Sequence, residues 1–233
     1  MSADAVVLGA GSSARMGGAD KLLADLEGDP VIVWSLRAFE ACQGIRAVVV
    51  TTSEHNDASI RSAVTQAGLA KVQAFVGGGS SRAASVLHGL RALNSKPPDY
   101  VAVHDGARPL VTTMLIEDGL RMARVYGAAV AAVPATDTLK IVDRDRLVIR
   151  TPLRSTVWHA QTPQFARFAD LLGAHERQTA MLDLYTDDVS VLEAEGLPVR
   201  VFEGSRENLK ITTPDDLDAA ARILRQRRAG AAR

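Results

Sequence analysis

Short apolar runs alternate along this chain with segments of helical periodicity. The runs at 47–50 and 100–103 are continuously apolar, which is typical of strands buried on both faces. The apolar runs predict strands over 4–9, 46–52, 71–76, 99–104, 128–133 and 198–203. The segments between them predict helices near 30–42, 56–67, 80–94 and 112–126. This alternation predicts right-handed crossovers and an α/β fold of Rossmann-like, three-layer type around a mostly parallel central sheet.

Three loops that each follow a predicted strand contain glycines together with charged residues. They span 9–21, 77–82 and 104–109. Ligands of open parallel sheets bind outside the carboxyl ends of the strands. We therefore expect these loops to meet at one edge and to form the site.

Residues 137–151 break the alternation. Two apolar segments, 138–142 and 147–151, flank a charged turn, which predicts a β-hairpin. Isolated two-stranded hairpins are only marginally stable in water, so the apolar side chains of this one need to pack against another surface. We expect an arm over 136–158 that serves dimerisation with a second copy of the chain.

The composition argues against several broad classes of protein. The 233 residues carry 27 basic and 27 acidic side chains, which argues against binding to nucleic acid or to a membrane surface. No apolar run reaches membrane-spanning length, so a cytoplasmic protein is expected. The single cysteine, Cys42, is interpreted as a buried structural thiol. No boundary demands two domains, so we expect one domain over 1–233 with a frayed tail at 226–233.

The loop after the first predicted strand has the form G-x-G-x-x-x-R, followed six residues later by lysine. Its small residues let backbone N–H groups approach a ligand, and Arg15 and Lys21 add two fixed cations. That combination suits a polyphosphate, although it matches neither the dinucleotide nor the P-loop pattern. The alternative is a glycine turn with two surface cations.

The second loop, 77–79, precedes a helix that starts near Ser80. Glycines before a helix N-terminus expose unpaired N–H groups to an anion or a base edge. Ser85 lies one turn inside the helix, where it could face the same pocket. A flexible loop with a serine cap is the alternative.

The third loop ends the fourth predicted strand. Asp105 is a candidate Mg²⁺ ligand, because magnesium takes one or two carboxylates plus substrate oxygens. Arg108 could hold a phosphate or pair with Asp105, and the pair could also serve only to fix the loop. We interpret His104 as a residue that supports the loop.

Later segments add further candidates and caps. Lys210 follows a strand-like run and could return to the phosphate site, or it could be a solvated lysine. Thr186 with Asp187 could bind substrate hydroxyls or cap a helix. Asp29-Pro30 and Thr213-Pro214 predict helix starts, and Pro163 is interpreted as another.

Together these residues favour in-line displacement at phosphorus, where catalysis is positioning plus charge stabilisation. An acceptor phosphate would attack a donor α-phosphate, and pyrophosphate would leave. The sequence holds no serine-hydrolase elbow and no zinc-ligand spacing.

An ordered set of motifs resembles the 2-C-methyl-D-erythritol 4-phosphate cytidylyltransferase family of the non-mevalonate isoprenoid pathway. The set comprises G-x-G-x-x-x-R-M…K, G-G-x-x-R-x-x-S-V, V-H-D-x-A-R-P, D-T-[LM]-K, W-x-x-Q-T-P-Q, T-D-[DE]-x-S and N-[LI]-K-[IV]-T-x-P-[DE]-D-L. The first motif is shared by many sugar-nucleotide pyrophosphorylases, and the later ones are more specific. The resemblance runs from about residue 4 to about residue 224.

The resemblance implies a role for each matching residue. Contacts to CTP would come from Ala10, Gly11, Gly78 and Ser85, with Gly106 beside the metal ligand. Arg15, Lys21 and Lys210 would be catalytic cations, and Asp105 would bind Mg²⁺. The methylerythritol phosphate would be held by Arg108, Thr138, Thr186 and, from the arm of the neighbouring subunit, Arg154. The family is homodimeric through that arm.

Some positions depart from the family pattern, and two rival functions stay open. The departures are Gly9, Ser13, Asp20, Ser80 and Gly106, of which Asp20 could pair with and divert Lys21. A ribitol-5-phosphate cytidylyltransferase would share the loop, the metal and the arm. A nucleotide- or dinucleotide-binding protein without transferase activity is the rival of a different class, although it leaves the cations beside Asp105 unexplained.

Overall fold

A seven-stranded sheet runs through the centre of the computed structural model, which describes residues 1–11 and 20–231. Its strands are β1 (Ala3–Leu8), β4 (Val48–Thr52), β5 (Val72–Gly77), β6 (Tyr100–Asp105), β7 (Ala128–Pro134), β10 (Trp158–Arg167) and β11 (Arg200–Glu203). The order is β11-β7-β10-β6-β1-β4-β5, and every neighbouring pair is parallel except the two made by β10. The six predicted strands and the mostly parallel sheet are confirmed.

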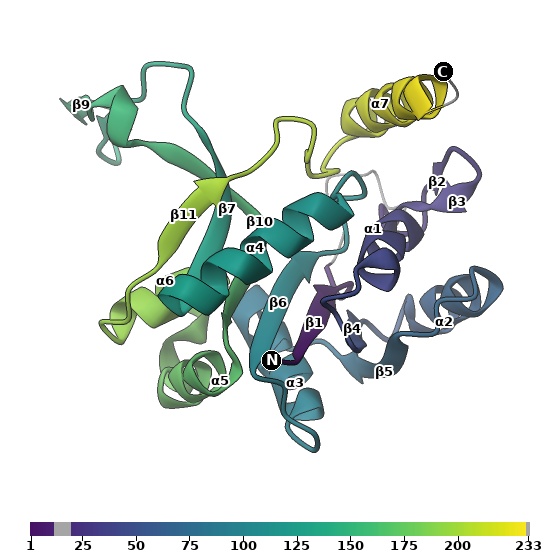
Figure 1. The fold of residues 1–233 in the computed structure, drawn as a ribbon. Coiled ribbons are helices and arrows are strands. Elements are labelled where there is room, and N and C mark those ends of the chain that lie inside the picture. Colours follow the sequence, from purple (N-terminus) through teal and green to yellow (C-terminus); the bar gives the residue numbers. More distant parts are fainter. Residues whose placement is uncertain (12–19, 232–233) are drawn as a thin grey trace.

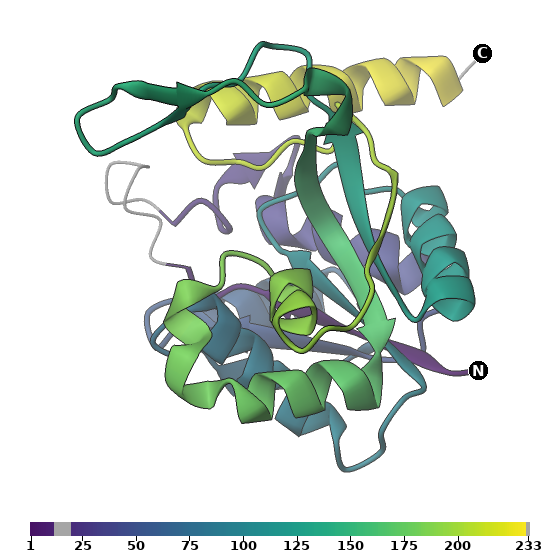
Figure 2. The ribbon, with the colours of Figure 1, turned by 90° about the vertical axis from the view of Figure 1, so that its left-hand side faces the viewer.

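Helices cover both faces of the sheet, which gives the expected three layers (Figures 1 and 2). One face carries α1 (Val31–Ala41), α2 (Asp57–Gln66) and α4 (Thr113–Tyr126), whose buried Phe39, Ile60 and Ile116 join one apolar cluster. The other face carries α3 (Arg82–Leu93), α5 (Phe168–Arg177) and α6 (Asp188–Ala194), with Leu87, Leu171 and Leu192 in a second cluster. Cys42 is buried in the first cluster, as expected.

Side-chain caps explain where three helices begin. The oxygens of Ser81, Thr112 and Asp187 accept hydrogen bonds from backbone N–H groups in the first turns of α3, α4 and α6. The cap predicted at Asp29 is wrong, because α1 begins after Pro30 and makes no side-chain cap. The Asp29 carboxylate instead accepts two hydrogen bonds from Arg37, nearly two turns into the helix.

The strand β10 was not predicted, and the helix start expected at Pro163 is wrong. Pro163 lies inside β10 and follows Thr162 through a cis peptide bond. The register of β10 against β7 shifts between Ala160 and Gln164, so the strand bends around the proline. Beyond the bend, Phe165 packs so closely on α4 that a Cβ at Gly119 would lie 2.0 Å from its ring.

The predicted hairpin is present and projects from the body of the protein (Figure 1). It consists of β8 (Ile141–Val142) and β9 (Val148–Arg150), followed by the 3₁₀ turn η2 (Arg154–Thr156). Its apolar side chains are exposed, with Leu147 at 71% and Ile149 at 64%.

The rest of the chain builds a rim beside the carboxyl ends of the strands. It includes a small hairpin of β2 (Asp25–Leu26) and β3 (Asp29–Pro30), the 3₁₀ segment η3 (Thr179–Leu184) and the last helix, α7 (Pro214–Ala231). Helix α7 begins with proline after a threonine, as predicted. None of the helices in the described part of the chain is both long and apolar enough to cross a membrane.

Candidate functional site

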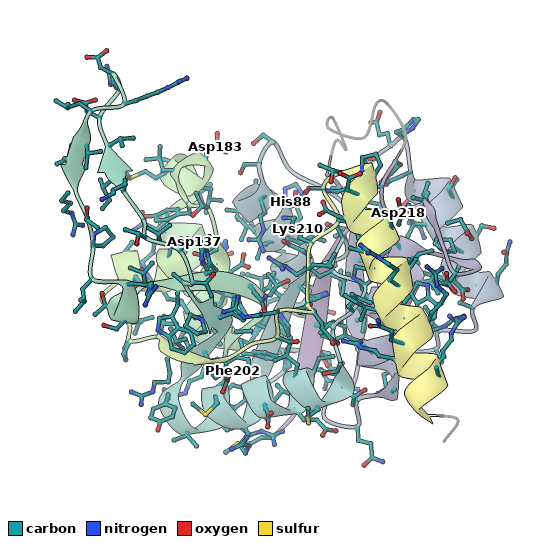
Figure 3. All side chains as sticks on the ribbon, turned by 90° about the horizontal axis from the view of Figure 1, so that it is seen from above. His88, Asp137, Asp183, Phe202, Lys210 and Asp218 are labelled. Atoms are coloured by element: carbon teal, nitrogen blue, oxygen red, sulfur yellow. The ribbon has the colours of Figure 1, made fainter. Side chains whose placement is uncertain are left out.

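The described ends of the first loop singled out in the sequence, 9–11 and 20–21, meet the other two loops at the carboxyl ends of β1, β5 and β6. There they enclose a cavity of about 500 Å³. It is lined by Leu8, Ala10, Gly11, Lys21, Leu22, Thr51, Gly79, Ser80, Ser81, Arg82, Ser85, Asp105, Ala107 and Lys210. Lys210 comes from the segment that leads into α7 (Figure 3). The expectation of a common edge is confirmed.

Two glycines expected at the nucleotide stand behind this lining rather than in it. A Cβ at Gly78 would lie 2.3 Å from the Cβ of Ala10, so its lack of a side chain lets two lining loops touch. Gly106 is buried and donates its N–H to the Leu8 carbonyl at 2.9 Å, while the next residue, Ala107, reaches the cavity. Arg15 lies outside the described residues.

The ends of the first loop are tied to the start of α2. The amide of Asn56 donates hydrogen bonds to the Gly9 carbonyl at 2.9 Å and to the Asp20 carboxylate at 2.8 Å. The other carboxylate oxygen of Asp20 accepts from the N–H of Leu22 at 2.9 Å. Asp20 therefore anchors the backbone next to Lys21.

Asp105 is the centre of the site's electrostatics. One of its oxygens accepts from Arg82 Nε at 3.1 Å and the other accepts from Lys210 Nζ at 2.7 Å, while Arg108 Nε lies 3.9 Å away. Burial raises the pKa of such a carboxyl, but the charges of Arg82, Lys210 and Arg108 outweigh burial and lower it well below its usual range. Asp105 is therefore a permanent anion among three cations.

Arg82 was not among the predicted site residues. It is the first residue of α3, and its guanidinium donates two hydrogen bonds of 2.9 Å to the buried carboxylate of Asp188. Burial lowers its pKa, but Asp188 and Asp105 together raise it above the ordinary value. The arginine in G-G-x-x-R was the signal in the sequence, but its partner Asp188 lies 106 residues away.

His104 supports the loop from behind, as interpreted from the sequence. Its Nε2 faces the Arg108 carbonyl at 3.3 Å, which requires a proton on that nitrogen. Its Nδ1 then accepts from the Thr162 hydroxyl at 3.1 Å, and that hydroxyl accepts from the N–H of Asp105 at 3.0 Å. Burial lowers the pKa of His104 to about 3, so the ring stays neutral and this chain of hydrogen bonds persists.

A second cavity of about 250 Å³ adjoins the first. It is lined by Arg82, Asp105, Arg108, Ala160, Gln161, Thr162, Gln164, Thr186, Asp187 and Lys210. Arg82, Asp105 and Lys210 line both cavities and so form the wall between them. Two neighbouring cavities with a charged common wall can hold two substrates against each other.

Buried polar residues of β10 shape the second cavity. The Gln164 side-chain oxygen accepts from the N–H groups of Asp188 and Val189 at 2.9 and 3.1 Å, which fixes the N-terminus of α6. Its amide nitrogen donates to the Asp187 carboxylate at 3.1 Å. Gln164 thereby holds the segment that carries Thr186, an effect that sequence reasoning missed because β10 itself was missed.

The four residues predicted for the acceptor separate into two pairs. Arg108 and Thr186 line the second cavity. Thr138 and Arg154 are exposed at the base of the arm, where Arg154 donates to the Thr136 carbonyl at 3.1 Å. Within one chain, this second pair does not line either cavity.

Both the sequence and the fold of this chain match those of known proteins. Residues 3–226 match the sequence model of the 2-C-methyl-D-erythritol 4-phosphate cytidylyltransferase family. The chain belongs to this family. It is therefore a cytidylyltransferase, and the resemblance seen in the motifs is confirmed.

Relatives and solved structures agree with this membership. Enzymes of this name from Synechococcus elongatus and Alkaliphilus oremlandii are 42% and 37% identical over 97% of this chain, covering 98% and 96% of their own lengths. The 4-diphosphocytidyl-2C-methyl-D-erythritol synthase of Anaerococcus prevotii superposes with a TM-score of 0.85 at 26% identity, with 96% of each chain covered. The cytidylyltransferase of Thermus thermophilus gives 0.76 at 29% identity, covering 97% of this chain and all of that one.

Proposed function

We propose that this cytidylyltransferase transfers CMP from CTP to the phosphate of 2-C-methyl-D-erythritol 4-phosphate, which yields the CDP-linked methylerythritol and pyrophosphate. The observation that carries the proposal is the common wall of Arg82, Asp105 and Lys210 between two cavities of unequal size. It supports a reaction between a large anionic donor and a smaller anionic acceptor. The names of the relatives supply the two substrates.

The larger cavity suits the nucleotide. Ala10, Gly11 and Ser85 line it with small groups, which leave room for a base and a ribose, and Lys21 and Lys210 supply cations for the triphosphate. Gly78 and Gly106 contribute by letting the lining loops approach each other. Arg15 is proposed as a further cation of the triphosphate site from its position in the motif.

Asp105 is the proposed ligand for Mg²⁺. The described residues contain no group of three or more histidine, cysteine or acidic side chains that could hold a metal, and Asp105 is surrounded by cations. One carboxylate fits magnesium only when substrate phosphates provide further ligands, which is how this ion is commonly held. When bound, the ion would neutralise developing charge on the phosphates.

The chain's own residues would then position and stabilise the reacting groups. An oxygen of the acceptor phosphate attacks the α-phosphorus of CTP in line with the leaving group. The bond to the β-phosphate oxygen breaks, and pyrophosphate takes the electron pair. The acceptor phosphate is already ionised and needs no general base, which fits the neutral His104 behind the wall. Lys21 and Lys210 would stabilise the five-coordinate transition state.

The second cavity suits the acceptor, and we infer that a second subunit completes it. Arg108 and Thr186 line it from one chain. Thr138 and Arg154 lie on the arm, so they would act in the site of the neighbouring subunit of a homodimer. The exposed apolar side chains of the arm support this, because water contact with them is unfavourable. A cytoplasmic location stays a prediction from the sequence.

Pyrophosphate release tests the proposal. The purified protein receives Mg²⁺ and CTP with 2-C-methyl-D-erythritol 4-phosphate, and a parallel reaction contains ribitol 5-phosphate. We expect release with the first acceptor and little with the second. Faster release with ribitol 5-phosphate would keep the mechanism but replace the acceptor. Binding of NAD(H) with no release from CTP would favour the non-catalytic alternative.

A further inference from the structure

Helix α7 lies outside both cavities, yet it packs on the three segments that carry Lys21, Arg108 and Lys210. A third apolar cluster, separate from the two that flank the sheet, joins Leu26, Leu110 and Ile211 to Leu224 of α7. Leu26 follows Lys21, Leu110 follows Arg108, and Ile211 follows Lys210 by five, two and one residues. The cluster therefore couples the helix to the backbone beside each cation.

Arginines on the last turns of α7 contact the same three segments through polar groups. Arg227 donates to the Leu110 carbonyl at 3.1 Å and to the Glu207 carboxylate at 2.8 and 3.1 Å. Arg225 and Arg228 pair with Glu27 at the turn of the β2–β3 hairpin. Figure 2 shows the helix lying across this rim of the protein.

The segment that carries Lys210 is held at several points besides Arg227. The N–H of Ile211 donates to the Ala107 carbonyl at 2.8 Å, and Arg108 donates to the Asn208 carbonyl at 2.7 Å. At the start of α7, the Asp216 carboxylate accepts four hydrogen bonds from Thr212 and Thr213. The segments with Arg108 and Lys210 are thus bonded to each other, and Arg227 spans both from outside.

We propose that α7 is a clamp that fixes the distances among Lys21, Arg108 and Lys210, and that Arg227 is the positioning residue that sets Lys210 relative to Arg108. This inference rests on the proposed function for its catalytic consequence. Arg227 touches neither cavity; it acts through Glu207, three residues before Lys210, and through Leu110, two residues after Arg108.

Arg227 contributes geometry more than stability. The side chains of Arg227 and Glu207 are 33% and 54% exposed, and ion pairs this exposed add little to the stability of a fold. A displacement of a catalytic group by ~1 Å, in contrast, can cost ~10²-fold in rate. Loss of Arg227 should therefore reduce turnover in a protein that remains folded.

The experiment compares Arg227→Ala with Arg222→Ala, which removes an exposed arginine from the same helix. Two measurements are made on each: hydrogen exchange of the backbone, and kcat and KM for CTP and for the acceptor. For Arg227→Ala we expect faster exchange over 206–211 and 107–111, with exchange in α2 unchanged. We expect kcat to fall about tenfold, which is less than the ~10²-fold cost of a ~1 Å displacement. KM for CTP should change by a smaller factor. Arg222→Ala should match the wild type in both measurements.

Two further variants separate positioning from folding. Arg227→Lys keeps the charge but cannot span Glu207 and Leu110 with one ammonium group, so it should restore less than half of the lost kcat. Glu207→Gln weakens the same contact from the other side. Its reduction of kcat should not add to the reduction caused by Arg227→Ala when the two substitutions are combined.

Three results would overturn the proposal. Unchanged exchange in Arg227→Ala would show that no clamp exists, and faster exchange with normal kcat would show that it does not position the cations. Full recovery in Arg227→Lys would reduce the effect to charge. If the wild type itself releases no pyrophosphate from CTP, the proposed function fails, and hydrogen exchange alone then decides whether the helix clamps the segments.

Discussion

The cluster around Asp105 and the projecting arm are built on opposite principles. In the cluster, buried carboxylates are paired with partly buried cations of the same chain, as Asp105 and Asp188 are with Arg82. On the arm, Leu147 and Leu153 are both 71% exposed. Burying unpaired charge and exposing apolar surface are both unfavourable. The cluster around Asp105 therefore finds its charge partners within one chain, whereas the exposed apolar surface of the arm supports the proposed contact with a second subunit.

The sharpest test of the first region is Lys21→Ala. Loss of one charge-stabilising donor costs about 10²–10³ in rate, so we expect pyrophosphate release to fall by that factor. Thermal unfolding should change little, because Lys21 lines the cavity and is only partly buried. Lys96→Ala, which removes an exposed lysine, is the matched control. Near-normal turnover would show that Lys21 does not face the triphosphate.

The second region is tested by mixing subunits. Arg154→Ala and Lys21→Ala are each expected to be inactive alone. After the two are mixed and allowed to exchange, half of the dimers are heterodimers with one intact site of two, which restores about a quarter of wild-type activity. The measurement is pyrophosphate release before and after mixing.

An arm variant provides the control for this rescue. Leu147→Asp places a charge on the exposed apolar face, so it should weaken association and abolish the rescue when present in both chains. Met114→Asp, at another exposed apolar residue far from the arm in the sequence, should leave the rescue intact. Rescue that fails without any arm variant would mean that each site is made from one chain.

Lowering the pH should reduce the free energy of unfolding of the protein. This is the smallest of the expected effects. Burial lowers the pKa of His104 from 6.5 to about 3, so between these values the unfolded state binds a proton that the native state does not. Stability should therefore fall with decreasing pH below about 6.5, by up to ~1.4 kcal/mol per pH unit for this group. Buried His175, whose pKa is also lowered by burial, acts in the same direction.

Denaturant unfolding between pH 7.5 and 5.0 measures this dependence. His104→Gln should be less stable than the wild type at pH 7.5 but should lose stability less steeply towards pH 5.0. An equal slope in the two proteins would place the acid sensitivity elsewhere.

The sheet was predictable because two of its central parallel strands include most or all of a continuous apolar run, at 47–50 and 100–103. The strand β10 was not, since the stretch from Gln161 to Gln164 is polar and contains a proline, and both features normally argue against a central strand. Only tertiary contacts reveal why they fit: Gln161, Thr162 and Gln164 are all buried and hydrogen-bonded.

The residues of the site also fall into those that the sequence predicts and those that it does not. Asp105, at the end of β6, and Lys21, at the end of the loop that follows β1, could be found from position and chemistry alone. Arg82 could not, because its environment depends on Asp188 in a helix contributed much later in the chain. Gly106 was expected in the site, beside the metal ligand, from its place in the motif, and in the structure a Cβ there would lie 2.8 Å from the Leu8 carbonyl oxygen.

The shared wall between the two cavities has an evolutionary consequence. Any substitution at Arg82, Asp105 or Lys210 alters the surroundings of donor and acceptor at once. Under the proposed function, adaptation to a different polyol phosphate would therefore fall on residues that border the smaller cavity only, among them Arg108, Gln161 and Thr186, and on the arm residues Thr138 and Arg154. In this fold, selection can change the acceptor while the nucleotide chemistry is inherited unchanged.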